Sequence, residues 1–388
     1  MDDVRNPFAP GAGSRPPELA GRDDILRQAE IAVQRVAMGR PTQPMVLLGL
    51  RGVGKTVLLN ACEEKAVQAG HLTSFIEAPE GRPLAELLYP KMIQTLRRLS
   101  ATDGARAAVH AALRALKGFA SGLKISVGDF SVAVDAEPGV ADSGMLDADL
   151  TDVFLRLGAA AQAAGRGWTL LIDEIQYLTE TELAALIVAL HRVSQKGLPI
   201  QFFGAGLPQL AALAGEAKSY AERLFRFVPI DRLDGPAAAR AITVPIRDEG
   251  EDITPEAVAA ILADTQGYPF FIQEWGFQAW NVAAASPITA ADVAAAAPVA
   301  LARLDESFFK VRFDRLTPKE RDYVLAMARL GQGPYRSADV AEAMGVPYKS
   351  LGPVRASIIA KGMIYSPGHG DIAFTVPLFE AFLARHYL

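Results

Sequence analysis

The sequence predicts an α/β protein whose parallel sheet is flanked by helices and followed by a helical lid and a C-terminal winged helix-turn-helix domain. Three observations lead to this prediction. An apolar segment, a glycine-rich loop and a helical pattern follow one another between residues 45 and 61. Strand and helix patterns then alternate as far as a helix that starts near Leu207, which favours parallel strands joined by helices. Beyond Asp234 the strand patterns stop, and two short ones return around Ile364 and Phe374.

Composition and charge exclude several classes of protein. With 388 residues the chain is longer than one ordinary hydrophobic core, so we expect several domains. No apolar run reaches the ~18 residues that a membrane-spanning helix needs. Asp2 and Asp3 stand where a basic leader would be, so we expect a cytoplasmic protein without a membrane partner. The single cysteine, Cys62, excludes an internal disulfide, and a net charge of −5 leaves room only for a local basic patch.

The glycine-rich loop from Gly49 to Thr56, the phosphate loop, is predicted to bind a nucleotide, ATP or ADP. Its glycines lack Cβ atoms, so backbone N–H groups can converge on phosphate oxygens at the start of the following helix. Lys55 supplies a positive charge to the β- and γ-phosphates, and the Thr56 hydroxyl is placed to bind Mg²⁺. The predicted binding residues of this segment are Gly49, Leu50, Arg51, Gly52, Val53, Gly54, Lys55, Thr56 and Val57.

The other elements are assigned by periodicity, in chain order. Residues 1–20, rich in Pro, Gly and Ala, are expected to form an extended leader, and residues 21–233 the α/β domain. Helices are expected where apolar residues recur every three or four positions, and strands where short apolar runs are bounded by turn residues. This predicts a helix after Arg22, a strand over 71–77, helices over 83–99, 104–116 and 147–164, a strand from Trp168, a helix over 180–193 and a strand over 199–203.

An alternating pattern interrupts this series at about residues 122–136. Leu123 and Ile125 precede Gly128-Asp129, and Phe130 and Val132 follow it, which predicts an inserted β-hairpin. The hairpin could contact a partner or cover a sheet edge.

The C-terminal third divides into a lid, residues 234–304, and a winged-helix domain, residues 305–388. Four helices are expected in the lid, over 236–244, 255–265, 270–283 and 290–304. Helices over 318–330, 337–344 and 348–361, two strands around a glycine turn and a last helix over 378–387 predict the winged helix. Lys349, Arg355 and Lys361 on its predicted recognition helix favour contact with double-stranded DNA, although three basic residues also fit a solvated face.

A pair of acidic residues completes the predicted active site. The apolar strand from Trp168 ends in Asp173 and Glu174. Asp173 at the carboxyl end of a sheet strand lies beside the phosphate loop and can hold Mg²⁺ through water. Glu174 then has the position of a general base that deprotonates the attacking water. With the complete loop upstream, the pair predicts Mg²⁺-dependent ATP hydrolysis.

These motifs resemble those of the AAA+ ATPases, in particular the branch of origin-recognition and Cdc6-like proteins and archaeal-type ATPases. Gly49–Thr56 is similar to the Walker A motif, and Asp173-Glu174 is similar to Walker B. The segment around Gly21 and Arg22 resembles the branch's N-terminal box, whose backbone lines the adenine. The resemblance implies that both residues contribute to the nucleotide site.

The resemblance also implies catalysis between subunits. Residues 219–225 look like the segment that carries the arginine finger in this branch. Arg223, or Arg226 as the alternative, would then act with Lys55 and Glu174 on a nucleotide bound by a neighbouring subunit of a homo-oligomer. Arg51, inside the phosphate loop, is expected to face solvent or that neighbour.

Two segments depart from the family pattern. Gly204-Ala205-Gly206 stands where the family usually has a polar sensor 1 residue, and no arginine occupies the sensor 2 position near Pro269. The glycine-any-proline form of residues 267–269 resembles the STAND signalling ATPases, in which the proline abuts the nucleotide. The alternative function is therefore a slow ATP/ADP switch whose winged helix docks on protein.

Overall fold

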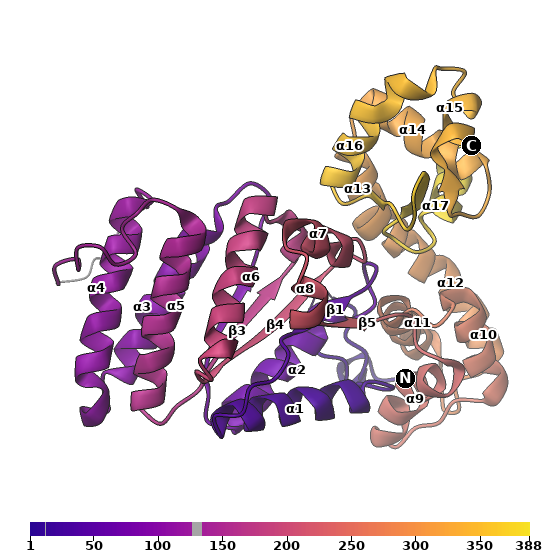
Figure 1. Cartoon of the computed structure of the whole chain (residues 1–388). Helices are drawn as coiled ribbons and strands as arrows, with labels where there is room; N and C mark the ends of the chain where they lie inside the picture. Colours follow the sequence, from indigo (N-terminus) through magenta and orange to yellow (C-terminus); the bar gives the residue numbers. More distant parts are fainter. Residues whose placement is uncertain (12, 126–133) are drawn as a thin grey trace.

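The computed structural model describes residues 1–11, 13–125 and 134–388 and shows three parts (Figure 1). One part is an α/β domain built on a five-stranded sheet. A group of helices lies at one end of this domain, and the C-terminal part of the chain stands above that end. None of the described helices is long and apolar enough to cross a membrane.

The sheet brings the predicted motifs to one edge. Its strands are parallel, in the order β2-β3-β4-β1-β5, and β3 and β4 are buried along their whole length. Because parallel strands end at the same edge, the loop after β1 and the acids at the end of β3 meet there. The strands are β1 (Met45–Leu48), β2 (Leu72–Glu77), β3 (Trp168–Asp173), β4 (Ile200–Gly206) and β5 (Arg226–Pro229).

Strand β5 was not predicted from the sequence. It has four residues, lies at the sheet edge and ends in Pro229, so its alternation is too short to be recognised.

Helices cover both faces of the sheet, each over its own hydrophobic core. One core joins Val33, Leu47 and Leu58, and the other joins Leu96 and Phe154 to the opposite side of the strands. On the first face lie α1 (Asp23–Ala37) and α2 (Lys55–Gln68). On the second lie α3 (Leu84–Leu99), α4 (Arg106–Gly122), α5 (Leu146–Ala163), α6 (Glu180–Gln195), α7 (Leu210–Ala217) and α8 (Ala221–Leu224).

The hairpin predicted at about residues 122–136 lies mostly outside the described residues. Of its described ends, Gly122 closes α4, and Leu123, Ile125 and Val134 are not in strands. The helix therefore runs farther than the predicted 104–116, because Phe119 continues its buried stripe.

The lid and the C-terminal part are joined by continuous helix. The lid consists of α9 (Gly235–Asp248), α10 (Pro255–Thr265), α11 (Pro269–Val282) and α12 (Ala290–Leu304). Helix α12 continues through the π-helical η5 (Asp305–Lys310) into α13 (Val311–Asp314). One hydrophobic core runs through both parts, so the lid and the C-terminal part are packed against each other.

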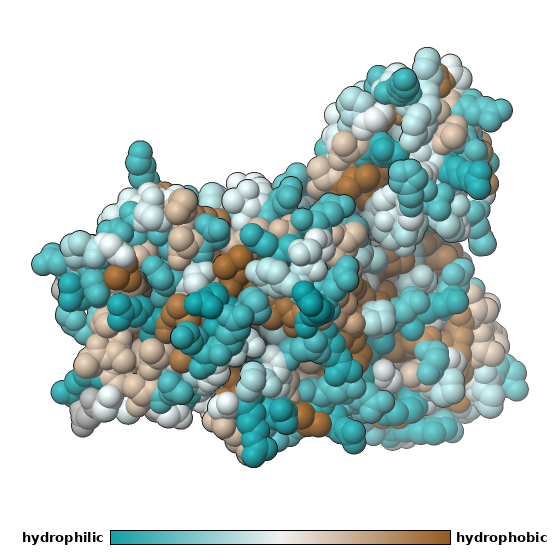
Figure 2. All heavy atoms as spheres, in the orientation of Figure 1, coloured by the Kyte–Doolittle hydropathy of each residue, from teal (hydrophilic) through white to brown (hydrophobic). Residues whose placement is uncertain are grey.

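The C-terminal domain, residues 318–388, combines helices with a small antiparallel sheet of order β6-β8-β7. Figure 2 shows that it stands out from the molecule and that a notch separates part of it from the α/β domain. Its elements are α14 (Pro318–Arg329), β6 (Tyr335–Arg336), α15 (Ser337–Ala343), η6 (Tyr348–Leu351), α16 (Gly352–Ala360), β7 (Ile364–Tyr365), β8 (Asp371–Phe374) and α17 (Phe379–Tyr387).

The leader is irregular apart from the short η1 (Asp3–Arg5), and it is packed against the lid. Phe8 is buried against Gly276 of α11, where an added Cβ would lie 2.5 Å from its ring. Arg15 donates to both carboxylate oxygens of Glu64 on α2, at 2.8 and 2.7 Å. The leader thus connects the lid to the helix that follows the phosphate loop.

Candidate active site

The phosphate loop owes its shape to three glycines in different situations. Gly52 and Gly54 have φ of 81° and 93°, a left-handed backbone that favours glycine. At Gly49 a Cβ would lie 2.2 Å from the carbonyl oxygen of Ile230. Helix α2 begins at Lys55, so its unpaired N–H groups face the loop.

A cavity of about 470 Å³ opens beside this loop. Its walls come from the loop, the leader and the lid, and Phe270 of the lid donates its backbone N–H to Gly52 O at 3.2 Å. Gly21, Gly49, Leu50 and Asp173 of the predicted set do not line it. Those that do are Arg22, Arg51, Gly52, Val53, Gly54, Lys55, Thr56, Val57, Glu174 and Pro269.

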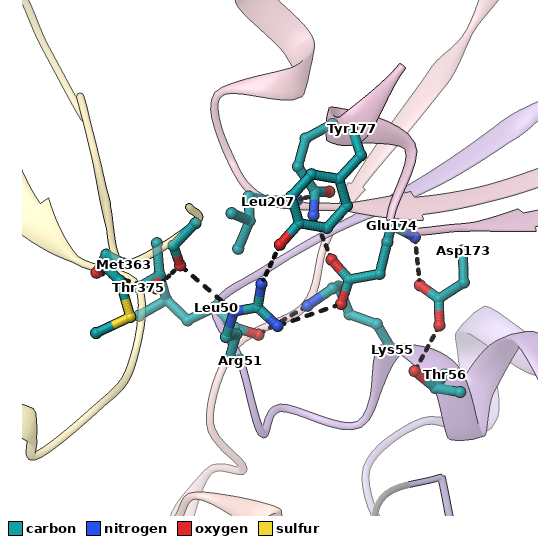
Figure 3. Close-up of polar contacts among 12 residues, drawn as sticks. Leu50, Arg51, Lys55, Thr56, Asp173, Glu174, Tyr177, Leu207, Met363 and Thr375 are labelled. Atoms are coloured by element: carbon teal, nitrogen blue, oxygen red, sulfur yellow. Dashed lines mark hydrogen bonds and ion pairs between the residues drawn. The ribbon is translucent and has the colours of Figure 1, made fainter. Parts of the chain in front are cut away.

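Lys55 is the most enclosed cation of the cavity. Its side chain is buried, and Nζ donates to Leu50 O at 2.9 Å (Figure 3). Burial lowers the pKa of Lys55 to about 8, although the charges of Glu174 and Asp173 act in the opposite direction. An anion in the cavity would raise this pKa again, because it stabilises the charged form.

Thr56 and Asp173 lie in contact, as the predicted metal site requires. The Thr56 hydroxyl donates to Asp173 Oδ2 at 2.5 Å. Burial raises the pKa of Asp173, and the hydrogen bond from Thr56 opposes this. Among the described residues no group of three or more His, Cys, Asp or Glu side chains could hold a metal ion. This pair of oxygen donors fits Mg²⁺, which takes few protein ligands and completes its shell with phosphates and water.

Glu174 is held on two sides. Its backbone is left-handed, with φ of 55°, and its N–H donates to Asp173 Oδ1 at 2.8 Å. Arg51 Nη1 lies 3.5 Å from Oε1, and Gln176 Nε2 donates to Oε2. Both carboxylate oxygens are therefore engaged.

The expectation that Arg51 faces solvent or a neighbouring subunit is wrong. Its side chain is only 19% exposed, and besides Glu174 it contacts Tyr177 Oη at 2.8 Å and Gly362 O at 3.4 Å. The C-terminal domain covers it, which a local sequence pattern does not reveal.

The Gln176 side chain lies against the end of β4, the strand where the family usually has a polar sensor 1 residue. Its Oε1 accepts the Leu207 N–H at 3.1 Å, and a Cβ on Gly206 would lie 2.8 Å from the same oxygen. A Cβ on Gly204 would lie 2.3 Å from Ile175. The two glycines of β4 therefore make room for the segment that follows Glu174.

Two arginines that the sequence analysis missed also line the cavity. Arg303, on α12, pairs with the buried Glu274 at 3.2 Å. Arg312, on α13, lies 4.0 Å from the centre of the Phe308 ring and donates to Phe308 O at 2.5 Å. Burial lowers the pKa of Arg312 to about 10, with Arg51 as a further contribution. Neither residue belongs to a recognisable motif, so position in the fold is their only signal.

The predicted arginine finger lies away from this cavity. Arg223 is exposed in a groove with Pro41, Thr42, His191 and Tyr220, at the edge of the sheet where the strands begin. The alternative, Arg226, is also exposed. The structure does not bring either residue to the phosphate loop of its own chain.

The three predicted DNA-binding residues differ in their surroundings. Lys349 is exposed, and Arg355 donates to Ser337 Oγ at 3.1 Å. Lys361 lies 2.6 Å from Glu320. Burial alone would raise the pKa of Glu320, but hydrogen bonds, foremost that from Lys361, lower it to about 2. Lys361 is therefore engaged within its own domain.

Comparisons with known proteins agree with this geometry. Residues 18–203 match the family model described as AAA ATPase domain, and residues 306–383 match a domain of unknown function, DUF8462. A search among curated proteins found no match. The Walker-type ATPase of Pyrococcus abyssi has a similar structure, with 16% identity, a TM-score of 0.58 and coverage of 95% of this chain and 97% of that chain.

Two further solved structures are similar at lower scores. The ORC1 protein of Aeropyrum pernix in complex with DNA has 15% identity and a TM-score of 0.47, covering 96% of this chain and 94% of that one. The RuvB branch migration motor of Thermotoga maritima has 15% identity and a TM-score of 0.48, covering 97% and 99%. From the match over residues 18–203 and the sheet that carries the loop, we conclude that this part of the chain is an AAA+ P-loop ATPase domain.

Proposed function

We propose that this protein binds ATP with Mg²⁺ and hydrolyses it slowly to ADP and phosphate. The observation that carries this proposal is that Lys55, Thr56 and Glu174 line one cavity, with Asp173 directly behind Thr56 (Figure 3). A buried cation, a pair of oxygen donors and a carboxylate are the groups that phosphoryl transfer to water requires.

Each residue has a distinct part in this reaction. Lys55 and the N–H groups of residues 52–56 bind the phosphates, and Leu50 O gives up Lys55 when the anion enters. Thr56 and Asp173 would hold Mg²⁺, which neutralises charge on the phosphate oxygens when bound. Glu174 accepts the proton of the attacking water. Arg303 and Arg312 add positive charge on the lid side of the cavity.

We propose Arg223 as an arginine finger supplied by another copy of this chain. Arg223 is exposed where the strands begin, away from the phosphate loop of its own chain, so in this role it would act on a nucleotide bound by a neighbouring subunit. We propose a homo-oligomer with shared sites on this ground.

The C-terminal domain gives two candidates for what the nucleotide state controls. The order of α14, α15 and α16 followed by β7 and β8 is the order expected of a winged helix, and on this ground we propose contact with double-stranded DNA through Lys349 and Arg355. A specific contact favours the second candidate, an ATP/ADP switch. The Arg51 N–H donates to Thr375 O at 2.9 Å, so the C-terminal domain docks on the phosphate loop itself.

Nucleotide binding and turnover of purified protein test the proposal. Lys55→Ala should abolish binding of fluorescent ATP, whereas Lys65→Ala, the same change in helix α2 at a residue paired with Glu30, should not. Glu174→Gln should keep ATP bound and stop turnover, because an amide cannot accept the proton. Turnover that persists in Glu174→Gln would exclude Glu174 as the base. Stimulation by duplex DNA would favour the first candidate, and turnover indifferent to DNA the second.

A further inference from the structure

We propose that Arg51 is a positioning residue that links the freedom of Glu174 to the docking of the C-terminal domain. This inference rests on the proposed function, since it concerns the proposed base. According to this proposal, the docked C-terminal domain slows hydrolysis, and its departure from the phosphate loop frees Glu174.

The first step concerns the contacts that hold the Glu174 side chain in place. Arg51 Nη1 lies 3.5 Å from Glu174 Oε1, and both side chains are 19% exposed (Figure 3). A base must turn a free lone pair toward the attacking water. Gln176 holds the other oxygen. Each oxygen keeps a second lone pair, but the two contacts fix the orientation of the carboxylate, so release of Arg51 lets Glu174 turn toward the water.

The second step concerns the hydrogen bonds that hold Arg51 in place, which come from two domains. Tyr177 Oη, three residues after Glu174, lies 2.8 Å from Nη2. On the other side the C-terminal domain supplies two carbonyl oxygens, Thr375 O to the backbone N–H at 2.9 Å and Gly362 O to Nε at 3.4 Å. The guanidinium is thus fixed between the base and the docked domain.

The third step is the closeness of the docking at Gly362. A Cβ at this residue would lie 2.9 Å from Arg51 Nη2 and 3.0 Å from Tyr177 Oη. The Thr375 hydroxyl also donates to Gly362 O, at 2.6 Å. Glycine lets the backbone of the domain approach this closely, and a methyl group there would push Arg51 and the domain apart.

These contacts make the base sensitive to the position of the domain. When the domain leaves, Arg51 loses two acceptors and gains freedom to release Glu174. Because α12, η5 and α13 form one helical run whose Ser307, Phe308 and Arg312 line the cavity, a bound nucleotide has a path to displace the domain. We infer that nucleotide-driven movement of this run relieves the restraint.

Gly362→Ala tests the inference from the side of the C-terminal domain. Gly345→Ala is a matched control, because Gly345 lies in the same domain with φ of 64°, against 63° at Gly362, and its Cβ would meet no atom within 4 Å. We expect kcat to rise about fivefold in Gly362→Ala relative to the control, the effect of losing one or two ordinary hydrogen bonds. The Kd for ATP should change less than kcat, since Gly362 does not line the cavity and Lys55 and Thr56 stay in place.

Two further measurements keep the result interpretable. Tyr177→Phe removes one contact of Arg51 without changing any backbone, and it should raise kcat, as Gly362→Ala does. Hydrogen exchange of the Arg51 amide reports docking without hydrolysis and should be faster in Gly362→Ala than in Gly345→Ala.

The outcomes separate the inference from the proposed function. Equal kcat and equal exchange in the two glycine variants would overturn the inference while leaving the ATPase intact. Faster exchange with a lower kcat would also overturn it, because docking would then assist the base. If Glu174→Gln hydrolyses ATP at the parental rate, the proposed function fails at its base, whatever the exchange shows.

Discussion

Arginines lie at both ends of the strands of the central sheet, but in opposite surroundings. At the edge where the strands end, Arg51 and Arg312 are enclosed by the C-terminal domain and the π-helical run, beside the buried Lys55. At the edge where the strands begin, Arg223 is exposed beside the residues that precede β1. The enclosed cations have partners in their own chain, whereas the Arg223 side chain is exposed and accessible to another molecule.

This difference separates two kinds of control. We propose that the enclosed cations act on the nucleotide of their own subunit and that the exposed Arg223 acts on the nucleotide of a neighbouring subunit. Four experiments distinguish these roles.

The largest effect is expected at the exposed edge. Arg223→Ala should lower ATP turnover by ~10³-fold, the contribution of an arginine finger supplied by another subunit. Mixing Arg223→Ala with Glu174→Gln should restore part of the activity, because a mixed pair builds one site from an intact base and an intact finger. Turnover per subunit should also rise with protein concentration.

Two controls locate the finger. Arg226→Ala tests the alternative residue, and Arg192→Ala removes an exposed arginine of α6 that bonds to Gln195. If mixing restores nothing although both variants fold and assemble, sites are not shared and the comparison between the two edges fails.

At the enclosed edge, Arg312→Ala should weaken ATP binding about 10-fold, since charge-assisted hydrogen bonds in a buried site contribute ~1.5–3 kcal/mol. ADP should be affected less if Arg312 reaches the terminal phosphate. Titration calorimetry with both nucleotides measures this. Arg315→Ala, an exposed arginine on the same helical stretch, is the control. Equal losses for ATP and ADP would exclude recognition of the γ-phosphate.

The pH dependence of binding tests the burial of Lys55. Its pKa in the free protein is about 8, and bound phosphates would raise it. Affinity for ADP should therefore be nearly complete at pH 7 and fall about 10-fold by pH 9, because the free enzyme loses the proton around pH 8. Glu174→Gln should shift this fall to lower pH, because the charge of Glu174 raises the pKa of Lys55. A flat profile to pH 10 would show that Lys55 is not the group that binds.

The C-terminal domain also contains one exposed basic residue, Lys349, and one that is paired within its own domain, Lys361. If the domain binds duplex DNA, charge reversal at the exposed Lys349 should reduce the salt slope of binding by about one unit. Lys361→Glu should mainly destabilise the domain, because it leaves Glu320 without its ion pair. Fluorescence anisotropy over a salt series and thermal unfolding separate the two effects. Indifference of DNA binding to Lys349 would place the contact elsewhere.

Local patterns predicted much of the fold. The helices over 255–265 and 290–304 have the predicted bounds, since capping residues and apolar periodicity agree there. The phosphate loop and the Asp173-Glu174 pair were also predictable. Their chemistry depends on backbone conformation over a few consecutive residues and on the end of one buried strand.

The surroundings of Arg51 depend on tertiary structure alone. Its contacts Gly362 and Thr375 lie more than 300 positions later in the chain, and no local period connects them. Arg312 and Gln176 were missed for the same reason, because their importance comes from the cavity and the glycines that they face. A short motif specifies which groups can bind a phosphate, whereas packing between distant segments decides which of them are held, covered or exposed.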